Sequence, residues 1–430
     1  MKRILLFVTV LSLCSYLAAQ DSNWEVYLNG FRVKSIAFEN DDVWGATDHF
    51  LFKFNRVNLS TTYFPFPDYA GRDMSSIIKI DKNGVKWIGL SEYLPSGKSI
   101  FESYQSSIYS FDGNQWKKIK SIGFGQITSL AIDRSNNKWI RTAGNNLYKI
   151  EQDSFVQYTT ENSRLVYGNV RQVASDRNGN IWVLDMGNYG LIGGDMELMK
   201  NDGEQWISYF SGAGVYGTFM IFDKQGNPWI QSYQRIQKLD TASTSNTWSE
   251  PMILQSFMPS FPDSLIIFGP YPELQAFEGE DTLWFNNRDN GIASYKDSVW
   301  SFYTTSNSEL PSDSVYTIAV DSNGTKWIGT AKGLAAFNEN GFEGTVGLHS
   351  QVMDEVEIFP NPAHEFITLK MPEDSQSSTV DILSIQGKII HSFSMLNDQT
   401  CLDVSHFPAG IYLVRVKSQQ NYIQKKFIKQ

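Results

Sequence analysis

The sequence is poor in the residues that most often form covalent cross-links or metal sites. It contains two cysteines, Cys14 and Cys401, and five histidines, of which only His49 lies in the repeated region described below. Cys14 falls in the predicted signal peptide, so the mature chain is expected to have no intramolecular disulfide and to be held by packing alone. The scarcity of histidine disfavours a His-based metal site or a Ser-His-Asp site in the repeated region.

Several sequence motifs of nucleotide, ester and metal chemistry are also missing. The chain has no Walker loop, no Gly-x-Ser-x-Gly elbow and no His-Glu-x-x-His. Its Asp-x-Asn-Gly turns are only superficially similar to calcium loops, which need more oxygen ligands and a distal Glu. We therefore expect no cofactor and no metal. The carboxylates of these turns are predicted to cap the turn backbone: Asp81, Asp176, Asp223 and Asp321.

Positive charge is in short supply. The chain has 36 Lys and Arg against 46 Asp and Glu, a formal net charge of −10 at pH 7. This acidic balance disfavours nucleic acid and anionic lipid surfaces as partners. No apolar run beyond the first 19 residues approaches the length of a membrane span, so we expect no transmembrane segment after the signal.

Residues 1–19 predict a secretory signal peptide. Lys2 and Arg3 precede a mostly apolar stretch from Ile4 to Leu13, and small residues end the segment at Ala19. Such a segment would direct the chain out of the cytoplasm, and we expect its cleavage after Ala19. Cys14 leaves a lipoprotein signal as an alternative, which the bulky Leu13 before it disfavours.

Residues 20–342 are dominated by an internal repeat. The clearest units contain an apolar strand, an Asp-x-x-Gly type of turn, a strand that begins with Trp, and two further strands, the last often carrying Trp-x-x-Tyr. The copies around Trp44, Trp139 and Trp284 are weaker. The seven repeat tryptophans are separated by 43, 52, 43, 47, 55 and 43 residues: Trp44, Trp87, Trp139, Trp182, Trp229, Trp284 and Trp327. Four short strands per unit at this period predict an all-β fold with a seven-bladed β-propeller.

The two ends of the repeat complement each other. Trp24-Glu-Val-Tyr27 has the pattern of a fourth strand but no unit before it, whereas the last unit has no clear fourth strand after Phe337. We therefore expect residues 24–27 to complete the blade of Trp327, which would leave no open edge strand in the ring.

One unit resembles the two-component regulator propeller repeat. The residues that carry this resemblance run from Asn307 to Leu334 and include Asp321-Ser-Asn-Gly-Thr-Lys-Trp327-Ile-Gly-Thr330. The weaker units extend it over about residues 24–342. In that family the repeats commonly form the periplasmic sensor of hybrid histidine kinases. Because this chain shows no transmembrane helix and no kinase after the repeats, we do not carry the sensor role over.

A different composition begins after a predicted linker at residues 343–354. Residues 355–430 contain Pro360-Asn-Pro362, then Gly387-Lys388, then Pro408-Ala-Gly-Ile-Tyr412, and a basic last strand. In this order they resemble the C-terminal sorting domain of the Bacteroidetes type IX secretion system. The resemblance implies a small β-sandwich that the outer-membrane translocon reads. We expect this sandwich to be separate and to have few contacts with the propeller. The resemblance also implies a secreted or cell-surface protein that passes through the periplasm. The alternative is an ordinary adhesive sandwich module.

Binding is the function that the insertions favour. With four antiparallel strands per blade, the insertions at 91–107, 185–197 and 249–272 all belong to connections on one face. Aromatic residues in them suit a glycan or protein ligand, with the alternative that they pack the loops onto the ring. Polar residues on the Trp strand could add hydrogen bonds, with harmless variation between blades as the alternative. The candidate ligand-binding residues are Tyr93, Phe101, Tyr189, Phe261, Arg141, Gln231 and Asn286.

A carbohydrate-active enzyme, a lyase or a glycoside hydrolase, is the alternative function. Asp185, Asp195 and Glu197 are the carboxylates considered for it. Two acids about 5 to 10 Å apart in the central mouth would favour the enzyme. A mouth of aromatic and amide side chains without such a pair would favour binding. We predict a binding protein without a catalytic site.

Overall fold

The computed structural model describes residues 23–67, 74–94, 104–144, 146–152, 154–187, 195–213, 219–232, 235–241, 249, 252–253, 273–342, 356–370, 378–384, 388–395, 399–417 and 422–430. Apart from one short 3-10 turn, η3 (Arg288–Asn290), the elements in this part of the chain are β-strands. The all-β class is confirmed. The predicted signal peptide and linker lie outside the described residues.

Seven four-stranded antiparallel sheets occupy the described residues between Trp24 and Phe337. Six of them are built from consecutive strands. These are β2 (Val33–Glu39), β3 (Asp42–Thr47), β4 (Phe50–Asn55), β5 (Thr61–Pro65); β6 (Met74–Ile80), β7 (Lys86–Tyr93), β8 (Tyr104–Phe111), β9 (Trp116–Phe124); β10 (Ile127–Ile132), β11 (Lys138–Thr142), β12 (Leu147–Glu151), β13 (Ser154–Tyr158); β14 (Val170–Ser175), β15 (Ile181–Met186), β16 (Asp195–Asn201), β17 (Trp206–Ala213); β18 (Phe219–Phe222), β19 (Pro228–Ser232), β20 (Arg235–Lys238), β21 (Met252–Ile253); and β22 (Glu273–Glu278), β23 (Thr282–Asn286), β24 (Ile292–Lys296), β25 (Val299–Tyr303).

The seventh sheet closes the ring with both ends of the repeat. It contains β26 (Val315–Val320), β27 (Lys326–Thr330) and β28 (Gly333–Phe337), and its outer strand is β1 (Trp24–Tyr27). β1 pairs antiparallel with β28, with Trp24 opposite Phe337 and Tyr27 opposite Leu334. The prediction that residues 24–27 complete the blade of Trp327 is confirmed.

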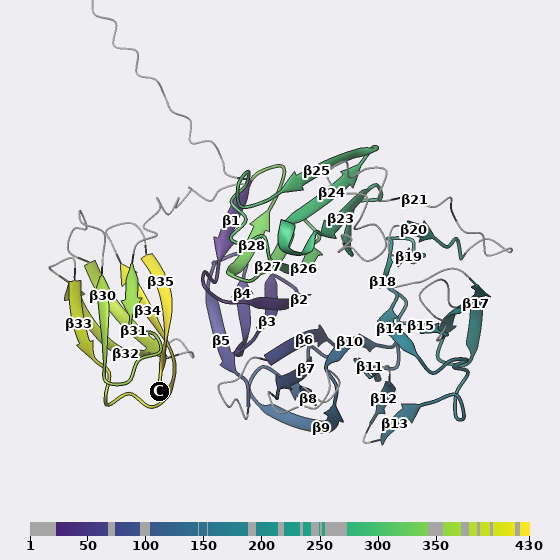
Figure 1. The fold of residues 1–430 in the computed structure, drawn as a ribbon, viewed down its shortest axis with the longest axis horizontal. Coiled ribbons are helices and arrows are strands. Elements are labelled where there is room, and N and C mark those ends of the chain that lie inside the picture. Colours follow the sequence, from purple (N-terminus) through teal and green to yellow (C-terminus); the bar gives the residue numbers. More distant parts are fainter. Residues whose placement is uncertain are drawn as a thin grey trace, which may run out of the picture.

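The sheets are arranged around a central axis as propeller blades (Figure 1). The first strand of each sheet contacts the first strand of the next, from β2 through β6, β10, β14, β18 and β22 to β26, and β26 contacts β2. This closed circle of first strands surrounds the middle of the ring. The second, third and fourth strands follow outward in each blade, as the repeat predicts.

The repeat tryptophans lie in the seams between blades. Each belongs to the hydrophobic cluster that joins its own blade to the next one, so Trp44 packs with Ile78 and Ile88 of the following sheet. At the closing seam Trp327 packs with Val33 and Phe54 of the first sheet. A flat indole fills such a narrow wedge and removes a large apolar area from water, which is why one Trp per unit stabilises the whole ring.

The tail forms two sheets around a core of its own. β29 (Glu357–Phe359), β30 (Phe366–Lys370) and β33 (Gln399–Asp403) make one sheet. β32 (Ile389–Met395), β31 (Ser378–Ser384), β34 (Gly410–Lys417) and β35 (Tyr422–Lys429) make the other. Val380, Ile382, Val414 and Phe427 are among the residues buried between them. The expected small β-sandwich is therefore present.

The tail also packs against the ring. Leu383 of β31 and Leu413 of β34 belong to the same buried cluster as Phe31 and Phe50 of the first blade. The expectation of few contacts between tail and ring is wrong at this surface. Alternation along a strand shows which residues point away from the sandwich core, but it does not show what covers them.

Candidate functional site

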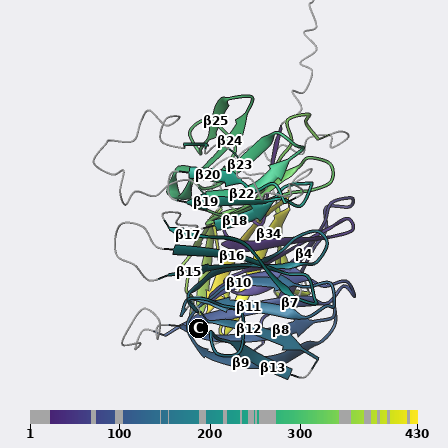
Figure 2. The ribbon, with the colours of Figure 1, turned by 90° about the vertical axis from the view of Figure 1, so that its right-hand side faces the viewer.

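The two faces of the ring carry different kinds of connection. The first-to-second and third-to-fourth connections of every blade lie on one face, which we call the turn face. The second-to-third connections and the links between blades lie on the other, which we call the loop face. Figure 2 shows the ring from the side. The insertions between β7 and β8, between β15 and β16, and between β21 and β22 all start and end on the loop face.

The turns of the turn face are capped by carboxylates that also hold the tryptophans. In the second blade Asp81 accepts backbone hydrogen bonds from Asn83 at 2.9 Å and Val85 at 3.1 Å. Its other oxygen accepts the Trp87 indole N–H at 3.0 Å. Burial opposes ionisation of Asp81, but these hydrogen bonds and that from Lys138 outweigh it and lower its pKa. The predicted turn-capping role is present, together with an indole contact.

The carboxylate-to-indole bond recurs around the ring. It has the same six-residue spacing in six blades, with Glu278 in the place of Asp in one of them. The pairs are Asp81–Trp87, Asp133–Trp139, Asp176–Trp182, Asp223–Trp229, Glu278–Trp284 and Asp321–Trp327. In the first blade Glu39 does the same at a spacing of five from Trp44. The constant spacing between acid and Trp is visible in the sequence and could have predicted these bonds.

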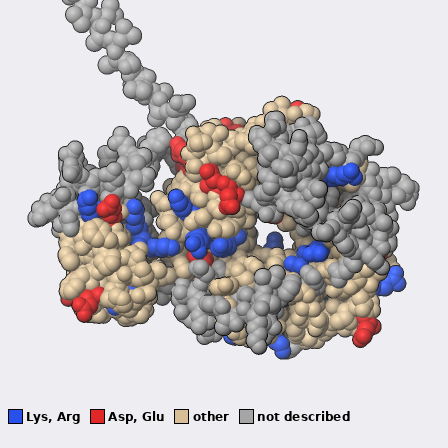
Figure 3. Space-filling model, viewed as in Figure 1, with Lys and Arg blue, Asp and Glu red and all other residues tan. Residues whose placement is uncertain are grey.

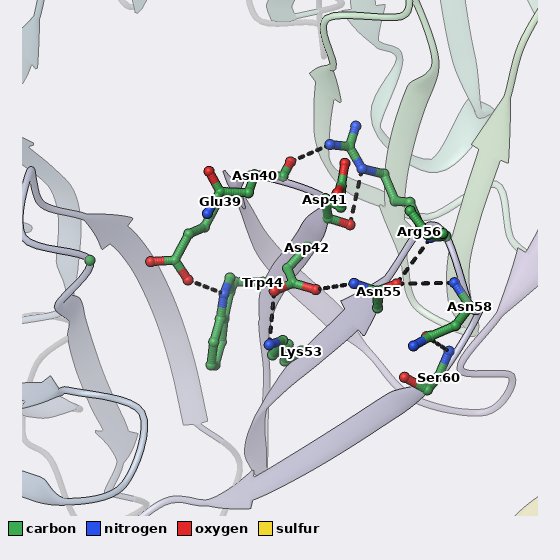
Figure 4. Close-up of polar contacts among 12 residues, drawn as sticks. Glu39, Asn40, Asp41, Asp42, Trp44, Lys53, Asn55, Arg56, Asn58 and Ser60 are labelled. Atoms are coloured by element: carbon green, nitrogen blue, oxygen red, sulfur yellow. Dashed lines mark hydrogen bonds and ion pairs between the residues drawn. The ribbon is translucent and has the colours of Figure 1, made fainter.

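Ion pairs connect neighbouring turns across several seams. The Lys86 ammonium lies 2.6 Å from a Glu39 oxygen, and Lys326 lies 3.0 Å from Glu278. In both pairs the Lys directly precedes the Trp of the following blade. In the first blade, Arg56 also donates to the backbone carbonyls of Asn40 and Asp41 (Figure 4). The turn face is thus occupied by contacts that hold the ring together.

The three polar candidates on the Trp strands lie on the loop-face half of the seams and are buried. The Gln231 side-chain oxygen accepts the backbone N–H of Leu274 at 2.8 Å. Asn286 donates to the carbonyl of Val315 at 2.9 Å. Arg141 donates to the carbonyl of Val170 at 2.9 Å. Each therefore bonds the first strand of the next blade, which is a structural role; a role in binding stays a prediction.

Arg141 has a second cation beside it. Its guanidinium also donates to the Thr128 hydroxyl at 2.5 Å. Burial, and after it the like charge of Arg171, lowers the pKa of Arg141 to about 10, so it remains charged at neutral pH. Arg171, on the first strand β14, is itself exposed. Two neighbouring guanidinium groups at this end of the seam create a local positive potential in an acidic protein.

Further cations lie on the first strands, which surround the middle of the ring. Lys34 of β2 lies with its ammonium 3.8 Å from the centroid of the Tyr316 ring of β26. Lys79 of β6 is exposed on another of these strands. Lys and Arg side chains appear at the edge of the central opening in Figure 3. No sequence pattern singles out Lys34 and Lys79, because the first strands come together only when the blades form a ring.

One of the four aromatic candidates is described, and it is exposed on the loop face. Tyr93 ends β7 with a relative exposure of 43% and pairs with Tyr104, which begins β8. Their rings meet edge to face at a centroid distance of 5.6 Å. Phe101, Tyr189 and Phe261 lie outside the described residues. The structure thus shows one aromatic pair at the base of an insertion.

The carboxylates considered for catalysis have structural contacts. Asp185 is buried, and its carboxylate accepts the backbone N–H groups of Val166, Tyr167, Gly168 and Asn169. Glu197 pairs across the strands with Asp185 and accepts the hydroxyl of Ser208. The Asp195 side chain lies outside the described residues.

Within the described residues, no group of three or more His, Cys, Asp or Glu side chains is placed to hold a metal ion. No helix in this part of the chain has the length and apolar character needed to cross a membrane.

Comparison with a protein-family model decides the identity of the tail. Residues 357–430 match the family model described as "Secretion system C-terminal sorting domain". The tail is a type IX sorting domain. A sorting domain implies export to the cell surface or secretion, so the chain is a secreted propeller protein. A comparison with curated protein sequences finds no match.

Solved structures similar to the chain support the propeller. One is the extracellular domain of a protein described as a hybrid two-component system, BT3049, from B. thetaiotaomicron, with 15% identity and a TM-score of 0.52. The match covers 95% of this chain but only 57% of that one. Another is streptogramin B lyase, with 11% identity and a TM-score of 0.51, covering 73% of this chain and 97% of the lyase. At these identities the likeness concerns the fold alone.

Proposed function

We propose that this exported protein binds an extracellular ligand, a glycan or a protein, on the loop face around the central opening. The observation that carries the proposal is the contact between the exposed Tyr93 and the half-buried Tyr104, which offers stacking surface at the base of an insertion. A rigid ring below it limits the entropy lost on binding. The proposed role is binding without catalysis.

The cations of the inner part of the ring indicate which charge the ligand carries. Besides burial, the charge of Arg171 on the first strand β14 acts on Arg141 and helps to lower its pKa, and Lys34 lies on another first strand of the same ring. In a chain with a net charge of −10, such a local excess of positive charge favours ligands with carboxylate or sulfate groups. Acidic glycans and acidic peptides are therefore expected to bind better than their neutral counterparts.

The test is a glycan and peptide array probed with the purified mature chain. Tyr93→Ala and Tyr104→Ala should each lower the affinity for a ligand found by the array by about 10-fold or more, because stacking surface is lost. Phe302→Ala is the matched control, since Phe302 is an exposed aromatic residue on the outer strand β25. Unchanged affinity in both Tyr variants, or equal losses with Phe302→Ala, would contradict the site.

The salt dependence of binding tests whether the ligand is acidic, and analysis of the ligand after incubation tests whether it is cleaved. If Lys34 and Arg171 attract an acidic ligand, affinity should fall as ionic strength rises, and Arg171→Gln should reduce that slope. Ligand cleaved during incubation with the protein would instead support the carbohydrate-active enzyme.

A further inference from the structure

The sorting domain has an apolar patch on the outside of its larger sheet. Along β31, Val380 and Ile382 belong to the sandwich core, whereas Leu383 is excluded from it. Along β34, Tyr412 and Val414 belong to that core, and Leu413 between them does not. Since successive residues of a strand point to opposite faces, both leucines lie on the outer face. Leu383 and Leu413 are direct cross-strand partners, so their side chains form one continuous patch.

This outer face is covered. Leu383 and Leu413 each have a relative exposure of only 1%. Asp381, two residues before Leu383 and therefore on the same face, is also buried. An outer face turned to water would leave leucines exposed, as it does for Ile389 on the neighbouring strand β32 of the same sheet, which has a relative exposure of 50%. The difference in exposure between Ile389 and the two leucines shows which part of the sheet another surface covers.

The ring supplies that surface at the first blade. Phe31 lies in the link between β1 and β2, and Phe50 begins β4, so both lie towards the loop face. Their rings meet edge to face at a centroid distance of 4.9 Å, and Phe50 meets Tyr63 at 5.1 Å. All three belong to the buried cluster that contains the two leucines.

A cation–π contact lies beside the leucine patch. Lys426 of β35 is the cross-strand partner of Leu413. Its ammonium lies 5.0 Å from the centroid of the Phe31 ring. The contact therefore comes from the same outer face and reaches the same aromatic cluster. Apolar burial at the centre with a cation at its side is a typical arrangement of a specific interface.

We propose that the sorting domain is docked on the first blade by this surface, and that the two parts stay bound to each other after the chain between them is cut. The occupant of the aromatic surface is thus the chain's own tail. Proteolysis in the linker then yields a non-covalent complex, and separation of propeller from tail requires a second event that undocks them. This inference does not depend on the ligand of the loop face.

The test begins with the mature chain carrying a site-specific protease sequence inserted within residues 343–354. After cleavage at micromolar concentration, gel filtration with light scattering should show both fragments in one peak with the mass of the uncut chain. Two separate peaks of folded fragments would overturn the proposal.

Variants locate the interface. Leu383→Lys together with Leu413→Lys should separate the cut fragments, with a loss of affinity of about 100-fold or more, because two buried leucines become charged. Ile389→Lys is the matched control: it adds the same charge to an exposed residue of the same sheet and should leave the complex intact. If the double variant co-elutes like the unsubstituted protein, the proposal is wrong.

A substitution in the ring tests the interface without altering the tail, so misfolding of a substituted tail cannot explain the result. Phe31→Gln changes the first blade and leaves the sorting domain unaltered. The cut fragments should again separate, while circular dichroism of each fragment matches that of the unsubstituted one. Co-elution of the Phe31→Gln ring with the tail at unchanged affinity would contradict the assigned interface.

Discussion

Arg56 in the first blade lies 2.6 Å from the carboxylate of Asp321 in the last, a contact between residues 265 positions apart in the chain. Asp321 also caps its own turn and accepts the Trp327 indole N–H at 3.0 Å. The ion pair therefore links the turn of the closing blade to the first blade, at the seam where the ring is joined by β1.

Removal of Arg56 should weaken that seam. Arg56→Gln leaves the Asp321 carboxylate with its turn and indole contacts but without its cation, so we expect the free energy of unfolding to fall by about 1–3 kcal/mol. Lys53→Gln is the control, because Lys53 pairs with Asp42 inside one blade and is more exposed, and it should cost less than about 1 kcal/mol. Equal losses in urea unfolding would argue against a special role of the seam.

The buried Trp24 of β1 should contribute more to the free energy of unfolding than the exposed Val26 of the same strand. The Trp24 ring stacks on Phe337 with a centroid distance of 4.4 Å and is buried at the closing blade. Trp24→Ala should lower the free energy of unfolding by about 3–5 kcal/mol through the cavity it leaves. Val26→Ala, in the same strand at an exposed position, should change it by about 0.5 kcal/mol or less. Thermal unfolding of both variants compares them, and a stable Trp24→Ala ring would refute closure by this contact.

The buried amides of the Trp strands should be needed for stability. Gln231→Ala removes the acceptor of the Leu274 N–H, and Asn286→Ala removes the donor to the Val315 carbonyl. Each variant should lose about 1–3 kcal/mol, because a buried backbone group is left unsatisfied. Gln157→Ala, which removes an exposed hydrogen bond to Asn146, is the control. A ligand role would show as an additional loss of affinity at temperatures where the variants are fully folded.

Glycine at the corresponding position of the last blade should resist substitution. A Cβ on Gly329 would lie 2.6 Å from the backbone carbonyl of Val33 in the first blade, which cannot move without shifting the seam. Gly329→Ala should therefore destabilise the ring by about 1–3 kcal/mol. At Gly89 the nearest atoms are side-chain methyl groups of Ile77 and Ile127, at 2.9 Å or more, and none of them is a backbone atom, so Gly89→Ala should cost less. Calorimetry that ranks the two in the opposite order would contradict this account of the seam.

Acid should destabilise the turn face. Burial raises the pKa of Asp81, but its hydrogen bonds lower that pKa by more than burial raises it. The folded-state pKa therefore lies below the ordinary value of 3.8. A depressed carboxylate pKa contributes stability that is complete above the unfolded-state pKa and is lost as the pH falls through the folded-state pKa. The contribution should therefore decline as the pH drops below about 4. Asp81→Asn should lower stability at pH 7 and flatten its fall in acid, measured by urea unfolding across pH 2–7; an unchanged slope would remove Asp81 as a cause.

Turn chemistry is what made much of the architecture predictable from sequence. Asp81 followed by Gly84 and Trp87 specifies a tight turn between two strands wherever it occurs, because these residues act on their nearest neighbours. The unmatched fourth-strand pattern at Trp24 likewise has one complementary place in the repeat. The candidate site is harder to predict from the sequence. The sequence indicates Tyr93 as an aromatic residue of an insertion, but its contact with Tyr104 depends on the pairing of β7 with β8.

By itself the sequence determined the all-β class, the order of strands in each blade, the closing strand and the sorting domain, because each depends on local turns, strand periodicity or a contiguous motif. Only the tertiary structure decided the use of Arg141, Gln231 and Asn286, whose side chains meet backbone groups of the next blade. It also decided that Leu383 and Leu413 are covered by the first blade. The physical reason is the same in both cases: a side chain's direction follows from its own strand, but its partner is set by surfaces that approach from distant parts of the chain.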